Sequence, residues 1–466
     1  MIMAKDRLGA PPLFPRLLKL ALPIMIQNGI TNFVNMLDNI MIGAVGTAPM
    51  TGVAVANQLY FVLTFCIFGA VAGAGIFGAQ YYGSGDREGV RYCFRFKLVA
   101  CGVLVALTYL VFGLWGEELL LLYMKGESGL TDAATAMDSA RSYLRVMLIG
   151  AVPYALAQCY SGTLRETSRP TLPMVAGVAA VVVNLCLNYI LIFGKLGAPA
   201  MGVVGAALAT VISRFVELAI VMLFAHLKPG RYEFMTGLYK NFRIPRKLVG
   251  TLFVKSLPLL ANEFLWATAM AFVSQCYSLR GLDSMAAFNI SQTCWNVFSI
   301  AYMAMGIADG IIMGQILGAG RLKEAKAASG RMILYSFLIA AVFGALFYIC
   351  AGFIPNFYNT EPEIRLLATR LMRICALLFP LEAACHACYF LLRSGGRMMV
   401  TFLFDSAYMW VINAGLAFVL SRFTSVSFEA IFALVQLCSA VKVVLGLIIV
   451  KSGFWVRNLV GKEQME

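Results

Sequence analysis

The chain has 466 residues, of which 61% are hydrophobic and only 13% are charged, and its mean hydropathy is +0.81. Soluble globular proteins carry roughly 25% charged residues, so this chain has too few charges to cover a surface that faces water. A net charge of +14 would suggest a nucleic-acid partner in a soluble protein. Here the positive-inside rule of membrane proteins explains the basic residues better, and we expect no nucleic-acid partner.

The apolar residues form runs of the length that a membrane-spanning helix needs. A helix of about 20 residues crosses the roughly 30 Å of hydrocarbon in a bilayer. The sequence predicts spans at 14–45, 51–80, 94–115, 140–162, 171–193, 202–227, 248–279, 285–316, 329–353, 364–391, 398–421 and 428–450. We therefore expect an all-α polytopic protein of the cell (inner or plasma) membrane, with twelve transmembrane helices and the lipid bilayer as a partner.

Basic residues alternate between the two sides of the predicted membrane. Lys and Arg cluster before span one and after every even-numbered span, at Lys5, Arg7, Arg16, Lys19, Arg87, Arg91, Arg95, Lys97, Arg165, Arg169, Lys228, Arg231, Lys240, Arg243, Arg246, Lys247, Arg321, Lys323, Lys326, Arg331, Arg393, Arg397, Lys451, Arg457 and Lys462. The loop after span three is acidic and contains Glu117, Glu118, Glu127 and Asp132. Since Lys and Arg concentrate in cytoplasmic loops, both termini are predicted to be cytoplasmic.

Two stretches of the chain match each other at a constant spacing. Gly78-Ala-Gln80-Tyr-Tyr-Gly83-Ser-Gly85 corresponds to Met313-Gly-Gln315-Ile-Leu-Gly318-Ala-Gly320, 235 residues later. Two halves of six spans each have the same orientation, which gives a parallel repeat. The predicted parts are an N-terminal six-helix lobe (1–227), a cytoplasmic linker (228–247), a pseudo-symmetric C-terminal six-helix lobe (248–455) and a cytoplasmic tail (456–466).

Four polar side chains of the N-terminal half fall at a similar depth within their spans. Counting residues from the predicted outer loops at 1.5 Å per residue places Asp38, Asn184, Asn188 and Thr210 at one level. A carboxylate, two amide carbonyls and a hydroxyl suit a small hard cation or a proton. The alternative is hydrogen bonding between helices, which is common for Asn and Thr in membrane bundles.

The C-terminal half carries two acids near the middle of spans, Glu263 and Glu382. Acids at this depth are costly unless they serve a cation, a proton or a cationic substrate, and the alternative is a structural pairing with a neighbouring helix. Glu382, Cys385 and His386 share one helical face, close to Cys388, which leaves open proton sharing, a metal site or simple packing. We have no account of Asp309 from the sequence.

Aromatic residues of the C-terminal half are candidates for lining a substrate path. Trp266, Trp295 and Trp410 could contact flat organic cations through their ring faces, although packing is the commoner role of aromatic residues in spans. The sequence contains nothing that resembles a nucleophile triad, a phosphate loop or an ATP motif. We therefore expect no enzyme and no tightly bound cofactor, and a transporter of this kind would draw on an ion gradient.

The chain resembles the multidrug and toxic compound extrusion (MATE) family, and its NorM-like branch in particular, over nearly its whole length. The similarity lies in the first span up to Asp38-Asn-Ile-Met-Ile-Gly43, in the paired loops around Gln80 and Gln315, and in the segment from Asn184 to Thr210. The resemblance implies an N-lobe Na+ or H+ site at Asp38, Asn184, Asn188 and Thr210, and a C-lobe cation or proton site at Glu263 and Glu382. It also implies that Gln292 and Asn296 line the C-terminal lobe, and we add Trp266, Trp295 and His386 as substrate-lining candidates.

The expected function is a secondary antiporter, present as a monomer, that exports small organic cations or drugs in exchange for inward Na+ or H+. Alternating access between the two lobes would be its mechanism. Two alternatives remain open from the sequence. One is a lipid-linked oligosaccharide flippase of the same superfamily, and the other is a metal-handling membrane protein that uses Glu382, Cys385 and His386.

Overall fold

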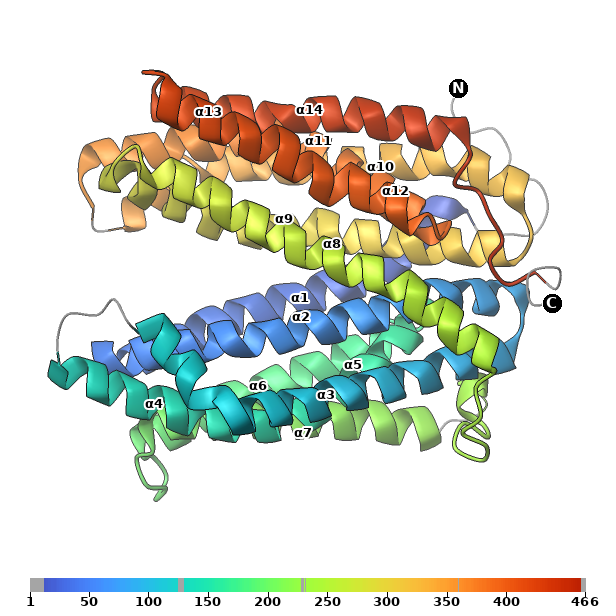
Figure 1. The fold of residues 1–466 in the computed structure, drawn as a ribbon, viewed down its shortest axis with the longest axis horizontal. Helices are drawn as coiled ribbons and strands as arrows, with labels where there is room; N and C mark the ends of the chain where they lie inside the picture. The colour runs from blue at the N-terminus through green and yellow to red at the C-terminus, as the bar shows by residue number, and fades with distance from the viewer. Residues whose placement is uncertain (1–11, 125–129, 228–229, 231, 359, 462–466) are drawn as a thin grey trace. The chain divides into compact units, whose positions relative to one another are not determined.

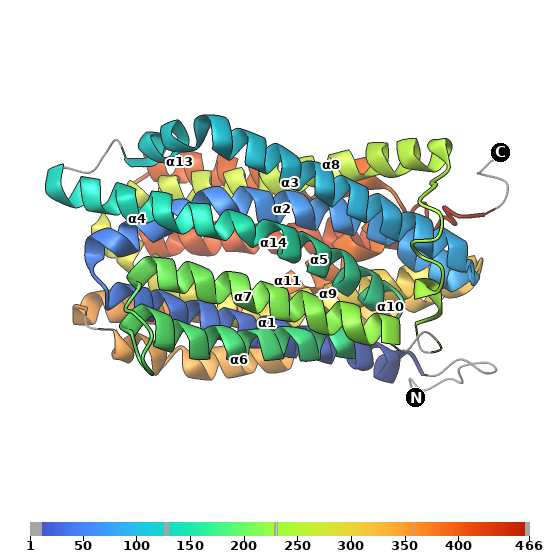
Figure 2. The same cartoon turned by 90° about the horizontal axis from the view of Figure 1, so that it is seen from below.

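The computed structural model describes residues 12–124, 130–227, 230, 232–358 and 360–461. All regular structure in these ranges is helical, and eleven of the described helices are long and apolar enough to cross a membrane (Figures 1 and 2). The all-α polytopic class expected from the sequence is confirmed. Residues 1–11 and 462–466, at the two termini predicted to be cytoplasmic, lie outside the described ranges, as do Glu127, Lys228 and Arg231.

The chain divides into two compact units, each treated separately below. The N-unit comprises residues 26–78 and 86–256, and the C-unit comprises residues 1–25, 79–85 and 257–466. Three long helices, α1 (Leu13–Gly43), α2 (Thr47–Ser84) and α8 (Arg246–Ser278), contribute to both units along their length.

The N-unit is completed by five helices and one short 3-10 turn. These are α3 (Arg87–Met124), α4 (Leu130–Ile149), α5 (Ala151–Glu166), α6 (Thr171–Phe193), α7 (Gly202–Leu227) and η1 (Glu233–Met235). The predicted fourth span, 140–162, corresponds to α4 and α5 together, which meet at Gly150. The backbone of Gly150 stays in the right-handed helical region at φ −70° and ψ −11°. Gly150 nevertheless forms a turn between α4 and α5, so the span is present as two consecutive helices rather than as one.

The C-unit contains the remaining helices. These are α9 (Leu282–Gly318), α10 (Leu322–Cys350), η2 (Ile354–Phe357), α11 (Pro362–Ser394), α12 (Met398–Phe402), α13 (Gly415–Phe423) and α14 (Phe428–Ser452). Between α12 and α13 the chain forms π-helical turns, η3 (Leu403–Ala407) and η4 (Met409–Ala414). Such turns add a residue to the helical repeat and occur frequently at functional sites.

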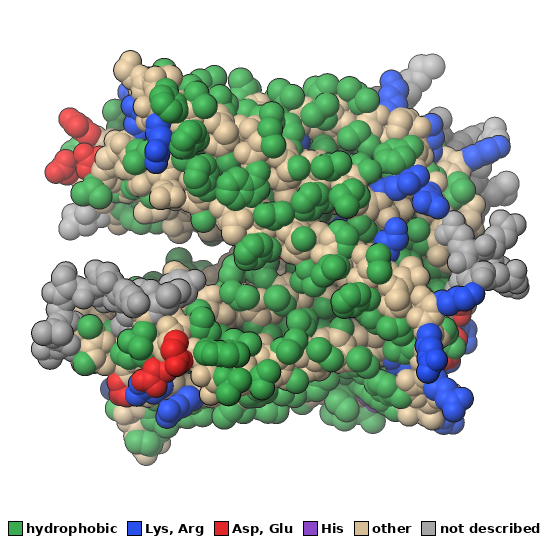
Figure 3. All heavy atoms as spheres, viewed as in Figure 1, with side chains coloured by type: hydrophobic (Ala, Val, Ile, Leu, Met, Phe, Trp, Pro, Cys, Tyr) green, Lys and Arg blue, Asp and Glu red, His purple; other side chains and the backbone are tan. Residues whose placement is uncertain are grey.

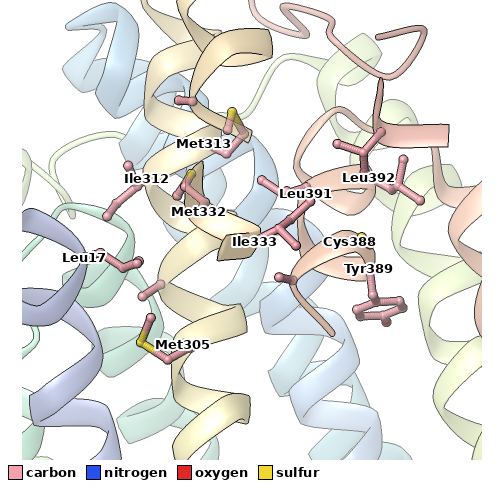
Figure 4. Packing of buried hydrophobic residues seen from close by; sticks show 14 of the residues in the cluster. Leu17, Met305, Ile312, Met313, Met332, Ile333, Cys388, Tyr389, Leu391 and Leu392 are labelled. Carbon is pink, nitrogen blue, oxygen red and sulfur yellow. The ribbon is translucent and has the colours of Figure 1, made fainter. Parts of the chain in front are cut away.

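The core of the C-unit is apolar and draws on helices that are distant in the sequence. Met305, Ile312 and Met313 of α9 pack with Met332 and Ile333 of α10, and Leu17 of α1 joins the same cluster (Figure 4). Leu391 and Leu392 of α11 complete this side. At about 25 cal/mol per Å² of buried apolar surface, such packing would hold the helices together in water, whereas in lipid close van der Waals contact takes over this role.

The two matching loops found in the sequence have the same backbone conformation and contact each other within the C-unit. Gly85 and Gly320 both have positive φ, 79° and 74°. A Cβ atom added to Gly83 would lie 2.0 Å from the carbonyl oxygen of Gln315, and one added to Gly318 would lie 1.9 Å from that of Gln80. Each loop thus needs a glycine so that the backbone of the other can approach.

On the surface that Figure 3 shows, charged side chains avoid the middle of both units. In each unit, most of the Lys and Arg side chains visible in Figure 3 gather at one end of the helices, and the broad middle is covered by hydrophobic side chains. Arg91 and Arg95 of α3 lie at the basic end of the N-unit, where they donate to the carbonyl oxygens of Phe234 (3.1 Å) and Leu238 (3.0 Å). A basic end beside an apolar middle is the surface expected of a membrane-spanning bundle.

Candidate functional site

The structure brings together the four polar residues that the sequence placed at one depth of the N-unit. Asn188 Nδ2 donates to Asp38 Oδ1 at 2.5 Å. With the Asn184 amide oriented so that both of its ends are satisfied, its nitrogen donates to the two carboxylate oxygens of Asp38 at 3.1 and 3.2 Å. Its oxygen then accepts from Thr210 Oγ1 at 3.3 Å. Helices α1, α6 and α7 therefore meet at this cluster.

Local helix geometry explains why these side chains converge. Asn184 and Asn188 are one turn apart and so share a face of α6. That face packs closely on α7, because a Cβ atom at Gly205 would lie only 2.6 Å from the carbonyl oxygen of Leu191. Small residues at such contacts let the backbones of membrane helices approach. The short distance between the two helices brings Thr210 within reach of Asn184.

The cluster around Asp38 has spare capacity for a positive charge. Asn188 is 1% exposed, and its Oδ1 atom is buried without a hydrogen-bond partner. Within the described part of the chain, no Lys or Arg forms an ion pair with Asp38, whose polar contacts are the amides of Asn188 and Asn184. A carboxylate and an unpaired amide oxygen are suitable ligands for a small hard cation, and a proton on the carboxyl group would equally remove the buried charge.

An ion pair lies on α7 of the same unit. Arg214 and Glu217 are three residues apart and form an ion pair, with 3.6 Å between Nη1 and Oε2. The guanidinium of Arg214 also lies over the ring of Tyr154, 4.6 Å from its centroid. Glu217 is thus already neutralised by its own helix, in contrast to Asp38.

In the C-unit, Glu263 has polar and basic neighbours on α11. Tyr389 OH donates to Glu263 Oε1 at 3.3 Å, and Arg393 Nη1 lies 3.9 Å from the same oxygen. Arg393 also donates to Tyr389 OH at 3.4 Å. No described contact joins Glu263 to Glu382, the other acid predicted for this lobe. The protein itself thus supplies Glu263 with a basic partner, Arg393.

A further acid, which the sequence reasoning did not single out, lies close by. Asp405 Oδ1 accepts from Lys442 Nζ of α14 at 2.8 Å, and Asp405 Oδ2 accepts from Asn262 Nδ2 at 3.0 Å. The same amide nitrogen donates to Tyr389 OH at 3.3 Å. Tyr389 thus links the Glu263–Arg393 pair to the Asp405–Lys442 pair in one network. A lysine in the middle of a predicted span was the signal in the sequence that could have revealed this pair.

Glu382 differs from the other acids of the C-unit. It is half-buried, and its carboxylate makes no hydrogen bond or ion pair with any described residue. Its backbone carbonyl lies 3.2 Å from His386 Nδ1, and the His386 ring packs on Tyr302 with 4.6 Å between centroids. The Tyr302 ring in turn packs near the Trp295 ring, with 5.9 Å between the ring centroids. Glu382 therefore belongs to a helix face beside an aromatic cluster.

The other predicted lining residues of the C-unit are accessible. Trp266 is 38% exposed, and Gln292 Nε2 donates to Asn296 Oδ1 at 3.1 Å on an exposed face of α9. Trp410, by contrast, is fixed by its indole nitrogen, which donates to the carbonyl oxygen of Leu265 at 2.9 Å. Trp266, Gln292 and Asn296 thus have surface that a ligand can contact, and their role as lining residues stays a prediction.

The described residues offer little to a transition metal. Among them, no group of three or more His, Cys, Asp or Glu side chains is placed to hold a metal ion. Cys385 and Cys388 are buried, and Cys388 packs in the apolar core near Leu391 (Figure 4). Asp309 is fully buried and accepts from Ser336 Oγ at 2.8 Å. These contacts place Cys385, Cys388 and Asp309 inside the helix packing.

Comparisons with known proteins agree with this arrangement of helices. The model of the MatE family matches residues 23–190 and 258–419, which together cover most of the chain and both repeats. The chain belongs to the MatE family. The gap in the match contains the basic segment predicted to be a linker, and the two matched stretches begin at Pro23 and Pro258, which are 235 residues apart.

Individual members of the MatE family cover nearly the same length. The probable multidrug resistance protein NorM of Thermotoga maritima is 25% identical over 423 residues, which are 89% of this chain and 87% of that protein. The multidrug resistance protein MdtK of Yersinia enterocolitica is 28% identical over 368 residues, covering 78% of this chain and 77% of MdtK. A solved structure of an outward-facing multidrug resistance MATE transporter of the MOP superfamily has a TM-score of 0.84 at 19% identity, over 94% of this chain and 96% of that one.

Proposed function

We propose that this protein is a secondary antiporter that exports organic cations or drugs in exchange for inward Na+ or H+. Membership of the MatE family and the names of NorM and MdtK support the drug-exporting part. The observation that carries the coupling part is the cluster around Asp38, with its unpaired buried Asn188 oxygen. An acid within a span that lacks a basic partner needs a cation or a proton to offset its charge.

The substrate class follows from the acid that is left unpaired in the C-unit. Glu382 lacks an ion-pair partner among the described residues and lies on the helix face that carries His386, next to Tyr302 and Trp295. A carboxylate beside aromatic rings attracts flat organic cations through charge and cation–π contacts. The Glu382 carboxylate would repel an anionic lipid-linked oligosaccharide, so we favour cationic substrates.

The remaining parts of the proposal concern topology. The Lys and Arg residues gathered at one end of each unit support a cytoplasmic location for that end and for both termini. We further propose that residues 1–227 and 248–455 act as the two lobes of an alternating-access transporter in the cell membrane. Its functional form would be a monomer, because the predicted ion and substrate residues all come from one chain.

The test uses purified protein in liposomes with Na+ and pH gradients imposed separately. Gradient-driven transport of a fluorescent organic cation should fall by about 100-fold in Asp38→Asn, because a neutral amide has no charge for an ion to offset. Glu382→Gln should instead weaken binding of the organic cation in the absence of any gradient. The matched control is Glu429→Gln, which removes an acid whose ion pair with Arg370 is exposed. Transport that persists unchanged in Asp38→Asn would refute the coupling site.

A further inference from the structure

The Asp405 carboxylate accepts hydrogen bonds from two donors, and one of them is an ammonium group, which lies where a small cation would otherwise bind. Lys442 Nζ lies 2.8 Å from Oδ1, and the buried amide of Asn262 holds Oδ2 at 3.0 Å. Ser406 Oγ donates to the Asn262 carbonyl oxygens of backbone and side chain at 2.7 and 2.8 Å. Each partner of Asp405 is therefore fixed by the protein itself.

The backbone at this point is built to present two consecutive side chains to one partner. Asp405 and Ser406 both contact Asn262, although neighbouring residues of a regular α-helix point about 100° apart. Both lie in the π-helical turn η3. The wider turn lets the carboxylate and the hydroxyl address the same amide, and π-helical turns are frequent at functional sites.

The ammonium group of Lys442 also lies near two aromatic rings and further polar groups. It lies 5.3 Å from the ring centroid of Phe404 and 5.9 Å from that of Tyr408. Glu382, on α11, and the thiol of Cys385 also interact electrostatically with it. The side chains of Lys442 and Asp405 are only 15% and 17% exposed. A pair enclosed to this degree is poorly screened by solvent, so its charge balance matters.

We propose that Lys442 is a tethered cation, which takes at Asp405 the place that a free coupling ion takes at Asp38. The inference rests on the proposed antiport, because it assigns the exchange of free ions to the Asp38 cluster alone. Lys442 keeps the Asp405 carboxylate neutralised throughout the cycle. Removing the ammonium group then leaves, beside the Asp405 carboxylate, a place for a monovalent metal cation.

The first experiment measures the midpoint of thermal unfolding of detergent-purified protein in NaCl and in choline chloride of equal ionic strength. All variants carry Asp38→Asn, so that the first ion site is silent. Adding Lys442→Met should lower the midpoint in choline by about 5–15 °C, because one partner of an enclosed pair is lost. NaCl should raise this midpoint again in a concentration-dependent manner, as ligand binding to the folded state requires. A further Asp405→Asn change should abolish the response to Na+.

Two controls separate the proposal from a general effect of charge. Lys442→Arg keeps the positive charge and should show no response to Na+, and Lys451→Met removes an exposed lysine at the end of the same helix. If Lys442→Met does not fold, Lys442→Ala purified with n-propylammonium chloride replaces it, and the small amine should restore the midpoint. Equal midpoints in Na+ and choline for Lys442→Met, together with no rescue of Lys442→Ala, would overturn the proposal.

The result of the unfolding experiment can be distinguished from the result of the transport assay that tests the proposed antiport. The unfolding experiment contains no membrane gradient and no drug, whereas the antiport is judged from transport by protein with Lys442 intact. A Na+ response in Lys442→Met would support the tethered cation even if Asp38→Asn still transported. Loss of transport in Asp38→Asn without that Na+ response would leave the antiport standing and overturn the role of Lys442.

Discussion

In the N-unit, two amides donate to Asp38, and a neighbouring hydroxyl donates to one of these amides. In the C-unit, by contrast, Glu263 and Asp405 lie beside Arg393 and Lys442. The two halves of the sequence repeat their glycine loops, but the two units neutralise these acids differently. The N-unit leaves Asp38 without a basic partner among the described residues, whereas the C-unit supplies basic partners for Glu263 and Asp405 from its own helices. A duplicated scaffold can therefore keep its packing while its two copies take different electrostatic tasks.

The N-unit also contains a permanent ion pair, which makes the comparison sharper. Lys97 Nζ lies 2.6 Å from both carboxylate oxygens of Glu166 and 3.0 Å from Thr163 Oγ1, and the lysine side chain is fully buried. Glu166→Gln should lower the free energy of unfolding by about 5 kcal/mol, since an uncompensated buried charge remains. The dependence of transport on Na+ or H+ should not change, because Asp38 is intact.

Denaturation of the purified Glu166→Gln variant and its ion dependence in liposomes check this prediction together. The double variant Lys97→Met/Glu166→Gln serves as the control and should recover most of the lost stability, because neither charge is left alone. An altered ion dependence in a variant that folds normally would contradict the division of roles within the N-unit.

Removing one partner of the Asp405–Lys442 pair should also lower the free energy of unfolding, but by less than at Glu166. Asp405→Asn should lower the free energy of unfolding by about 3 kcal/mol, because both side chains keep some exposure and Lys442 retains its aromatic neighbours. In a double-mutant cycle with Lys442→Met, the two changes should be strongly non-additive. The exposed Arg370–Glu429 pair is the matched comparison, and its coupling should be below about 1 kcal/mol. Additive effects at Asp405 and Lys442 would show that the pair does not act as one.

The smallest effect is expected at Thr210, at the edge of the Asp38 cluster. Thr210→Val removes a hydroxyl of nearly the same size, and a neutral hydrogen bond contributes about 1 kcal/mol. We expect roughly a fivefold rise in the concentration of coupling ion needed for half-maximal transport, without loss of protein. Thr293→Val, on the exposed face of α9, should leave that concentration unchanged. An identical shift in both variants would remove Thr210 from the ion site.

Much of the architecture could be predicted from periodicity and length. The long apolar runs gave the spans, and counting from the loops placed Asp38, Asn188 and Thr210 at one level, where the structure shows their contacts. The fourth span was harder, because α4 and α5 are separate helices on either side of Gly150. Hydropathy registers how apolar a segment is, but not whether its helix is continuous.

The charged network of the C-unit could not be predicted in the same way. Asp405 lies in π-helical turns, where the rule that residues i and i+4 share a face no longer holds. Lys442 is on another helix, and nothing in the sequence specifies that α14 packs its lysine towards Asp405. The Glu263–Glu382 pairing expected from the family resemblance stays a prediction, while the described contacts of Glu263 are with Tyr389 and Arg393.

The reciprocal contact between the two glycine loops has a consequence for the history of the chain. Gly83 receives the backbone of Gln315, and Gly318 receives that of Gln80. A contact in which residue i meets j and j meets i is the mark of a two-fold symmetric dimer interface. The reciprocal contact is the geometry that the fusion of the two copies in a two-fold symmetric dimer would leave within one chain. In such a dimer one substitution would alter both loops at once, whereas the fused chain can change each copy independently.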